Sequence, residues 1–391
     1  MQKAKSLVLG ITGGIAAYKA AELVRLLIKA DIDVQVVMTE AATQFITPLT
    51  MQALSGKPVY VGMWDSNIDN GMPHIELSRN ADAILISPAS AEFVAKLLHG
   101  RADDLLSTLC LARDCPLLVA PAMNKQMWEN PATRRNFAQL EADDIRIFGP
   151  GNGEQACGET GDGRMLEPEQ LLALVIAHFT PKILADKKVL ITAGATIEMI
   201  DPVRGITNLS SGKMGYALAQ TAADMGAEVT LISGLTHLAP PINVTMHRAD
   251  NANAMYHAVM SHIQGQDVFI GVAAVADYSP SEKANHKIKK NSDTLNLSLR
   301  RNKDILSDVA VLVNPPFCVG FAAESEHVIE HASQKRISKK LPLIVANEVS
   351  AMGSNDNEVT LIDETGTYPL KPSTKTKVAY LILEHMSKLL P

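Results

Sequence analysis

Three side chains in the first half of the sequence, an imidazole, a carboxamide and a thiol, have the chemistry that an active site uses. His74 lies in a loop before a polar stretch, Asn124 directly follows an apolar run, and Cys157 lies in the glycine-rich segment ACGETGDGRM. Open parallel sheets bind ligands beyond the carboxyl ends of their strands, which favours Asn124 as a site residue. A lone histidine is usually structural and a lone cysteine is usually inert. Cys157 is a better candidate than most cysteines, because a glycine-rich loop offers little apolar burial.

Glycines near the start of the chain could bind a phosphate. Gly10 lies near the end of an apolar run, 6–11, and Gly13 and Gly14 lie between that run and a segment with helical spacing, 15–29. Backbone N–H groups at the start of a helix attract anions, and glycines let the anion approach closely. The spacing is not GxGxxG, and no clear acidic residue follows where a ribose contact is expected. Glycines that serve only a tight turn are an equally good interpretation; if a phosphate binds, a mononucleotide such as FMN fits better than NAD.

The second half of the sequence has a different set of polar groups. DPVR, residues 201–204, is followed by TNLSSGKMG, residues 207–215, in which Ser, Gly and Lys precede a helical pattern. This order is typical of a phosphate-binding turn, although GxxxxGK[ST] is absent, and a capped helix with a solvated lysine is a reasonable alternative. Asp277 ends an apolar run, and KIKK, residues 287–290, follows it. A lysine run is usually a solvated face, but its position after a ligand-side loop favours anion binding.

Hydrophobic periodicity divides the chain into two units that position these groups. Each unit alternates short apolar runs, predicted as buried parallel strands, with segments of helical spacing. The predicted strands are 6–11, 34–38, 83–87, 116–120, 189–193, 229–232 and 267–275, and the clearest helices are 15–29, 171–179 and 212–225. The pattern restarts after 180–188, which predicts a linker there. We therefore predict an α/β protein with two doubly wound, Rossmann-like domains, at 1–180 and 188–391.

Composition narrows the class of protein. The formal net charge of the 391 residues is -6, which argues against a nucleic-acid or anionic-membrane partner. The four cysteines are too few for a disulfide framework in a chain of this length. No apolar run reaches the roughly 18 residues of a membrane span, and Gly13 and Gly14 interrupt the stretch that could be mistaken for a signal peptide. We therefore expect a cytoplasmic protein.

The first half contains motifs that are specific in combination: TGGIAAYK (12–19), PLT with QALSG (48–56), HIEL (74–77), PAMN (121–124), and QACG (155–158) with GRM (163–165). Together they resemble the flavin-dependent cysteine decarboxylases, and specifically those that act on phosphopantothenoylcysteine. The resemblance covers nearly all of 1–180. One departure is Asp103, which stands where the family usually has Asn.

This resemblance implies a role for each polar group. The cofactor is FMN, and oxidation of the cysteine thiol supplies the electron sink that loss of CO2 requires. His74 is implied as the base, Asn124 as the group that holds the leaving carboxylate, and Cys157 as the acid that protonates the resulting enethiolate. The implied cofactor contacts are Thr12, Gly13, Gly14, Thr39, Ser87, Ala89 and Ser90, and the implied substrate contacts are Arg164 and Met165.

The motifs of the second half are DPVR, TNLSSGKMG, AAVADY (273–278), KIKK, GFAAE (320–324) and QKR (334–336). They resemble phosphopantothenate–cysteine ligase across 188–391, with Ile197 standing where the family commonly has Arg. The implied reaction activates the carboxylate of 4′-phosphopantothenate with CTP as an acyl-cytidylate, which the cysteine amine then attacks. Positioning and charge are sufficient for such catalysis. A divalent cation, Mg²⁺ or Mn²⁺, is expected with the triphosphate, and its ligands are not identified.

The ligase resemblance also implies site residues. Lys287 would neutralise charge on the CTP phosphates, and Asn208 and Arg204 would hold the substrate and the acyl-cytidylate. The implied nucleotide contacts are Gly271, Ala273, Asp277, Lys287, Lys303, Asp304, Ile305, Leu306, Phe321, Lys335 and Lys339.

The order of the two halves matches the bacterial fused enzyme of coenzyme A biosynthesis. The implied partners are 4′-phosphopantothenate, cysteine and CTP, together with other copies of the chain, as trimers through the flavin halves and dimers through the ligase halves. Two other classes fit part of the pattern. A non-catalytic flavoprotein on the same fold would explain the glycines but not His74, Asn124 and Cys157 together. A nicotinamide-dependent dehydrogenase is disfavoured by the missing GxGxxG and by KIKK.

Overall fold

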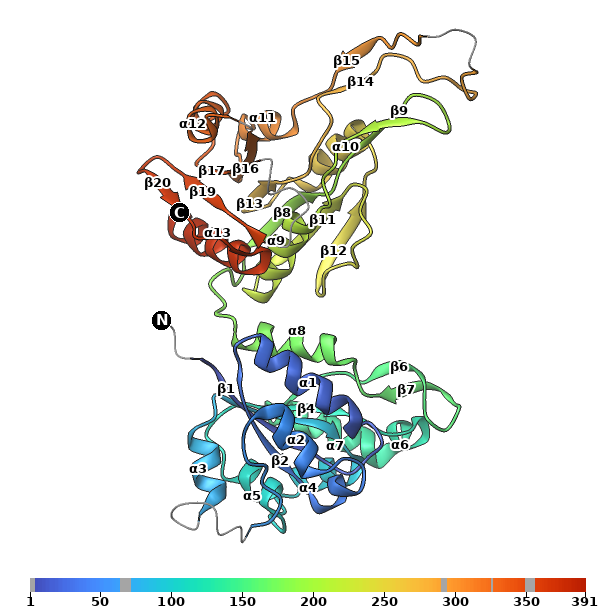
Figure 1. The fold of residues 1–391 in the computed structure, drawn as a ribbon, viewed down its shortest axis with the longest axis vertical. Coiled ribbons are helices and arrows are strands. Elements are labelled where there is room, and N and C mark those ends of the chain that lie inside the picture. The colour runs from blue at the N-terminus through green and yellow to red at the C-terminus, as the bar shows by residue number, and fades with distance from the viewer. Residues whose placement is uncertain (1–3, 64–71, 290–293, 325, 349–355) are drawn as a thin grey trace. The chain divides into compact units, whose positions relative to one another are not determined.

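The computed structural model describes residues 4–63, 72–289, 294–324, 326–348 and 356–391. The chain forms two compact units, Met1–Phe179 and Thr180–Pro391, and each is a separate α/β body (Figure 1). Within the described ranges, no helix is both long enough and apolar enough to cross a membrane.

The first unit is built on a five-stranded parallel sheet with the strand order β2-β1-β3-β4-β5. The strands are β1 (Ser6–Ile11), β2 (Asp33–Met38), β3 (Ala83–Ala89), β4 (Leu117–Pro121) and β5 (Arg146–Ile147). The helices are α1 (Ala17–Lys29), η1 (Glu40–Gln44), α2 (Pro48–Ser55), α3 (Pro73–Arg79), α4 (Ala91–Leu98), α5 (Leu105–Leu111), α6 (Lys125–Glu129), α7 (Pro131–Ala142) and α8 (Pro168–Phe179).

Helices cover both faces of this sheet, which explains why its central strands are apolar throughout. In β1, Leu7 and Leu9 pack into a core with α1, α2 and α8, whereas Val8 packs on the other side with α4, α5 and α7. The alternation follows from the two-residue period of a strand.

The second unit contains an eight-stranded sheet with the order β12-β11-β8-β13-β16-β17-β19-β20, parallel from β12 to β17 and antiparallel from there to β20. The strands are β8 (Lys188–Ala193), β11 (Glu228–Ser233), β12 (Val244–Arg248), β13 (Val268–Gly271), β16 (Phe317–Glu324), β17 (Leu343–Glu348), β19 (Val359–Ile362) and β20 (Thr367–Pro369). The helices are α9 (Lys213–Asp224), α10 (Ala252–His262), α11 (Ile305–Ala310), α12 (Val328–Ser338) and α13 (Lys375–Leu389). One core forms with α9 and α13, and the other with α10, α11 and α12. The doubly wound α/β class predicted for both units is therefore confirmed.

Within the described residues, four short antiparallel strand pairs lie outside the two main sheets. Three join consecutive strands: β6 (Gly151–Glu154) with β7 (Thr160–Arg164), β9 (Ile197–Met199) with β10 (Gly205–Thr207), and β14 (Tyr278–Pro280) with β15 (Leu299–Arg301). The fourth pairs β18 (Asp356–Asn357) with β21 (Ser373–Thr374), which β19 and β20 separate in the chain. Figure 1 shows β9, β14 and β15 extending away from the main sheet of the second unit.

Two segments differ from the sequence prediction. The strand expected over 267–275 ends at Gly271, because the next two backbone N–H groups, of Val272 and Ala273, turn toward the Thr192 hydroxyl. The segment 180–188, expected to be a linker, packs onto the second unit. Leu184 is fully buried there, and its N–H donates to the Met225 carbonyl (3.0 Å).

Candidate active sites

The glycine turn of the first unit joins β1 to α1 and is fastened to the neighbouring turn after β3. The Thr12 hydroxyl donates to a β3 carbonyl (2.7 Å) and accepts from the backbone N–H of Ser90 (2.9 Å). A Cβ on Gly13 would lie 2.6 Å from the Cβ of Ala41, whereas a Cβ on Gly14 would meet no atom within 4 Å. Packing therefore requires glycine at Gly13, and Gly14 leaves the backbone open to a ligand.

A cavity of about 600 Å³ opens beside this turn, a size typical of small-molecule sites. Its walls come from the glycine turn, the start of α4, the segment 122–127 and the β6–β7 hairpin. The expected site residues that line it are Gly13, Gly14, Ser90, Asn124, Cys157, Arg164 and Met165. The expected residues that do not line it are Thr12, Thr39, Ser87, Ala89 and His74.

A chain of hydrogen bonds connects Asn124 to Cys157, and both of these residues line the cavity. Asn124 caps α6 by accepting from the N–H of Met127 (3.0 Å), and its Nδ2 donates to Oε1 of Gln126 (2.8 Å). Gln126 donates in turn to Oε1 of Glu159 (2.7 Å), and the Cys157 thiol lies 3.6 Å from Oε2 of that carboxylate. The amide is thus held by its cap, and the exposed thiol lies on the hairpin opposite it.

Two charged residues that were not predicted from the sequence, Lys19 and Glu167, hold the part of the cavity wall formed by Arg164 and Met165. Lys19 is almost fully buried, and its Nζ donates to the carbonyl of Met165 (3.1 Å) and to Oε1 of Glu167 (2.9 Å). The same Oε1 accepts from Nη2 of Arg164 (2.7 Å). The hydrogen bond from Lys19 is the main cause that holds the pKa of Glu167 below its usual value. The signal in the sequence was Lys19 itself, a charged residue on the apolar face of α1.

The expected residues outside the cavity have structural partners or lie elsewhere. The Thr39 hydroxyl caps η1 through the N–H of Ala42 (3.2 Å), and the buried Ser87 hydroxyl contacts the sulfur of Met165 (3.7 Å). His74 lies near the start of α3. Figure 1 places α3 at the opposite side of the first unit from β6 and β7, which carry the Cys157 loop.

In the second unit, a cavity of about 170 Å³ lies at the carboxyl ends of β8 and β13. The expected nucleotide residues that line it are Gly271, Ala273, Asp277, Lys303, Asp304, Ile305, Leu306, Phe321, Lys335 and Lys339. Lys287 is not among the lining residues. Parallel sheets bind ligands at this edge, which agrees with the position of the cavity.

One ion pair and one partly buried lysine set the charge in this cavity. Lys339 pairs with Asp304 (2.6 Å), which caps α11 through the N–H of Ser307 (3.0 Å). Burial raises the pKa of Asp304, but the hydrogen bonds from Lys339 and Ser307 outweigh it and leave the pKa below its usual value. Lys335 donates to the carbonyl of Phe321 (3.2 Å), and burial lowers the pKa of its ammonium. An anion entering this cavity would relieve that cost of burial.

A second cavity, of about 280 Å³, adjoins the first along 271–277, Phe321 and Lys335. Its other walls are the turn 210–215, which contains the SSGKMG motif, and the side of Lys375 at the start of α13. Lys375 and Asn347 were not predicted from the sequence, because each is far along the chain from any motif.

The remaining expected ligase residues lie beside these cavities. Nδ2 of Asn208 donates to the carbonyl of Ala274 (3.0 Å), and Ala274 lines the second cavity. Arg204 forms an ion pair with the buried Asp201 (2.6 Å), and Lys287 is exposed on the segment between β14 and β15. The last residue of KIKK, Lys290, lies outside the described residues.

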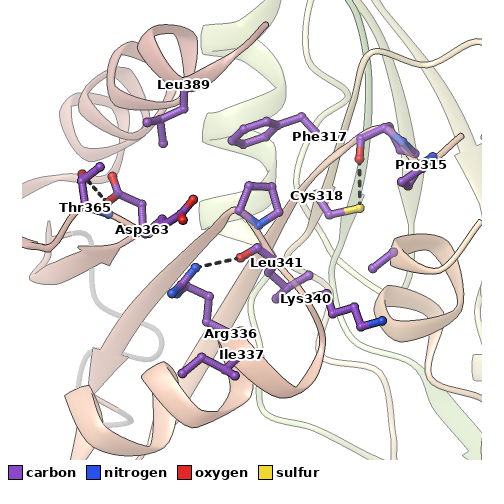
Figure 2. Close-up of a pocket in the computed structure, with 14 residues that line it drawn as sticks. Pro315, Phe317, Cys318, Arg336, Ile337, Lys340, Leu341, Asp363, Thr365 and Leu389 are labelled. Carbon is purple, nitrogen blue, oxygen red and sulfur yellow. Dashed lines mark hydrogen bonds between the residues drawn. The ribbon is translucent and has the colours of Figure 1, made fainter.

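A larger cavity of about 690 Å³ lies at the other edge of the same sheet, at the amino ends of β16 and β17 (Figure 2). Asp363 bonds to Thr365 (2.7 Å) and to His385 (2.8 Å), and Nη1 of Arg336 donates to the Leu341 carbonyl (3.3 Å), whereas the buried Nε of Arg336 has no hydrogen-bond partner among the described residues. None of the expected site residues lines it.

Both departures from the family motifs have local structural explanations. Asp103 bonds to Lys96 (2.9 Å) and Arg101 (2.7 Å), beside the N-terminal cap of α5. Ile197 packs over Gly205 in the β9–β10 hairpin, where a Cβ on the glycine would lie 2.6 Å from the isoleucine side chain.

Comparison with known proteins assigns a class to each half. Residues 1–180 match the flavoprotein family, and residues 184–390 match the C-terminal domain of the DNA/pantothenate metabolism flavoproteins. The crystal structure of the C-terminal domain of the coenzyme A biosynthesis bifunctional protein CoaBC is 41% identical, covers 54% of this chain and 98% of that one, and gives a TM-score of 0.47.

Full-length relatives carry the assignment further. The coenzyme A biosynthesis bifunctional protein CoaBC of Vibrio vulnificus strain YJ016 is 50% identical over 99% of this chain and 98% of its own length. The CoaBC protein of Escherichia coli strain K12 is 45% identical over 98% of this chain and 96% of its own length. The chain therefore belongs to the CoaBC family of bifunctional coenzyme A biosynthesis proteins. It is an enzyme that combines a decarboxylase and a ligase, and the class expected from the motifs is confirmed.

Proposed function

We propose that the two units catalyse consecutive steps. The second unit joins 4′-phosphopantothenate to cysteine through an acyl-cytidylate made from CTP. The first unit decarboxylates the resulting 4′-phosphopantothenoylcysteine to 4′-phosphopantetheine with FMN as cofactor. The observation that carries the proposal is that each unit brings part of its expected set of site residues together around cavities at the carboxyl edge of its own sheet.

The first cavity suits FMN at the glycine turn. Gly13 and Gly14 bring the backbone to the cavity wall, Ser90 caps the adjoining helix α4, and Thr12 fastens the two turns together. When bound there, FMN would supply the oxidation and reduction that this decarboxylation needs.

Each protein group around the cofactor would then have a separate role in binding the substrate or in transferring a proton. Asn124 faces the cavity with its amide fixed by the α6 cap and would hold the substrate carboxylate before it leaves. Cys157 would give a proton to the decarboxylated carbon, because its thiol is exposed on the β6–β7 hairpin and borders the same cavity. Arg164 would attract the anionic substrate, and Met165 would pack against it. His74 would act as the base.

The paired cavities of the second unit suit a nucleotide and an anionic acid. Four cations, Arg301, Lys303, Lys335 and Lys339, line the first of them against two carboxylates, Asp277 and Asp304, so positive charge prevails. CTP would bind there. In the second cavity three lysines, Lys213, Lys335 and Lys375, stand against Asp277 alone, so the phosphate and carboxylate of 4′-phosphopantothenate would bind there, with Asn208 and Arg204 nearby. Mg²⁺ or Mn²⁺ would enter with the CTP phosphates.

We also infer that the sites are completed by other copies of the chain. Neither His74 nor Lys287 lines the cavity that it is expected to serve. Ile15 and Tyr18, which border the first cavity, are 62% and 61% exposed, as expected of apolar groups that a second copy covers. Trimers of the first unit and dimers of the second would meet this need. The free cysteines agree with a reducing, cytoplasmic location.

Two variants of the full chain test the assignment of one reaction to each unit. His74→Asn should still make 4′-phosphopantothenoylcysteine from CTP, cysteine and 4′-phosphopantothenate, and this product should accumulate. Lys287→Gln should form it at only a small fraction of the wild-type rate, yet should decarboxylate the compound when it is supplied. The assignment is wrong if either variant loses both reactions while its folding and bound flavin match the wild type.

A further inference from the structure

Asp201 is a fully buried carboxylate that the proposed reaction does not use. It lies in the turn between β9 and β10. Its Oδ1 accepts from the backbone N–H groups of Val203 (2.8 Å) and Arg204 (2.9 Å), and its Oδ2 accepts from Nε (3.0 Å) and Nη2 (2.6 Å) of Arg204. A buried charge is costly unless it is paired and hydrogen-bonded, so this turn is built around the carboxylate.

The carboxylate also reaches across the sequence to the residue that follows Lys287. The N–H of Ile288 donates to Oδ2 of Asp201 (3.1 Å), and Nη2 of Arg204 donates to the Ile288 carbonyl (2.9 Å). Both backbone groups of Ile288 are therefore held by one ion pair. A further bond, from the N–H of Ala284 to the carbonyl of Ile200 (3.0 Å), ties the same two segments together.

These bonds fix the backbone on both sides of Lys287, whose side chain is exposed. A lysine ammonium is a point charge on a flexible four-carbon chain, so the backbone position largely decides where its charge can go. Arg204 uses Nε and Nη2 of its guanidinium in this arrangement. The hydrogen bonds from Arg204 are the main cause that holds the pKa of Asp201 far below its usual range, so the ion pair persists at neutral pH.

We propose that Asp201, with Arg204, is a positioning residue for Lys287, which it holds by both backbone groups of Ile288 so that the lysine can meet the CTP phosphates. This inference rests on the proposed role of Lys287 in forming the acyl-cytidylate. We call the arrangement of Asp201 and Arg204 on the backbone of Ile288 the clamp. The primary role of Arg204 is then in the clamp, and the buried carboxylate has a function that does not require contact with substrate.

The test is rapid-quench measurement of acyl-cytidylate formation from labelled CTP by the full-length chain. Asp201→Asn removes the negative charge at nearly constant size and should slow cytidylate formation by about 10–100-fold, because displacement of a reacting group by about 1 Å costs that much. The Kd for CTP should change less than the rate.

Asp363→Asn is the matched control. Among the residues whose burial the structure describes, Asp363 is the second buried aspartate of this unit. It accepts from the backbone N–H groups of Thr365 and Gly366, and it borders the cavity of Figure 2 at the opposite edge of the sheet. It should lower the thermal midpoint but leave the rate of cytidylate formation within about twofold, as expected for a change outside the site.

Arg204→Lys is the second variant, in case Asp201→Asn does not fold. It keeps the positive charge beside Asp201 and removes the planar fork that bonds Ile288, so it should also slow cytidylate formation. In a double-mutant cycle, Asp201→Asn should cause little further loss when Lys287→Gln is already present, whereas a general effect on folding would lower the residual rate by the same factor.

The outcomes separate the two proposals. If Lys287→Gln forms the cytidylate at the wild-type rate, the proposed role of Lys287 fails. If Lys287→Gln is slow while folded Asp201→Asn and Arg204→Lys are both as fast as the wild type, the role of Lys287 stands and the clamp is overturned. Equal losses from Asp201→Asn in both backgrounds of the cycle would overturn it as well.

Discussion

The Cys157 thiol is set apart from the other cysteines by its surroundings. Burial raises the pKa of Cys115, and Cys110 and Cys318 are buried, whereas Cys157 is exposed beside Glu159 at the cavity of the first unit. A thiol that must deliver a proton late in a reaction needs direct access to the substrate.

Cys157→Ala should therefore allow oxidation and CO2 release but block the final protonation. A decarboxylated product that is two hydrogens lighter than 4′-phosphopantetheine should accumulate, and mass spectrometry detects it directly. Cys115→Ala is the matched control and should give the normal product. Normal 4′-phosphopantetheine formation by Cys157→Ala at an ordinary rate would remove this cysteine from the mechanism.

A second prediction concerns the carboxylate of Glu167, which accepts hydrogen bonds from both Lys19 and Arg164. Glu167→Gln leaves the buried Lys19 ammonium without an anion and should lower the free energy of unfolding by about 1–3 kcal/mol at pH 7. The pKa of Glu167 is lowered in the fold, so its contribution is full above the unfolded value of about 4.3 and is lost as pH falls through the folded value.

Thermal unfolding of the wild type and of Glu167→Gln measures this contribution to stability at pH 7 and near pH 3.5. Both proteins must still be folded at the start of each scan. The difference between the two proteins should shrink at the lower pH. An equal difference at both values would mean that the ionised carboxylate is not what stabilises this wall of the cavity. Glu169→Gln is the control, since Glu169 lies two residues further along, in the first turn of α8, and is not a member of the Lys19–Glu167–Arg164 network.

At the scale of elements, strands buried on both faces were the easiest to predict. The runs 6–11 and 189–193 are mostly apolar because helices cover both sides of each sheet, and β1 and β8 lie within one residue of those bounds. The glycine turn and the AAVADY loop could be placed for the same reason, since each follows such a strand, whereas SSGKMG could be recognised by the helical pattern that it begins.

The projecting hairpins could not be predicted in the same way. β7 was expected to be loop, because Gly161 and Gly163 weaken any strand signal and the hairpin buries few side chains. β9 and β14 have three residues each, too few for periodicity to register. The clamp of Asp201 on Ile288 joins two such segments, so only the structure brings those residues together.

Leu184 decides to which unit the segment 180–188 belongs. Leu184→Ala should destabilise the second unit by about 2–5 kcal/mol, because it empties a fully buried site in the core with α9. Ile183→Ala, at a position that is 41% exposed, should change stability by less than about 0.5 kcal/mol. Calorimetry with flavin fluorescence distinguishes the units: only the transition that does not release flavin should shift. A shift in the flavin transition alone would assign Leu184 to the first unit.

At the scale of the whole molecule, the location of His74 predicts that one copy completes the site of another. His74→Asn and Cys157→Ala should each block 4′-phosphopantetheine formation alone. Mixed oligomers, made by co-expression of the two variants, should recover part of the wild-type rate, because some sites then combine a normal histidine with a normal cysteine. Mixed oligomers with no more activity than either parent would place both residues in one copy.

A label on the carboxyl carbon of cysteine reports on both proposed reactions in a single experiment. The full-length chain is incubated with 4′-phosphopantothenate, CTP, Mg²⁺ and cysteine labelled at its carboxyl carbon, and products are followed by mass. We predict that the label first appears in 4′-phosphopantothenoylcysteine and then leaves as CO2, while unlabelled 4′-phosphopantetheine forms, and that omission of CTP stops every step. Label that never enters the amide, or that is retained in the final product, would contradict the account.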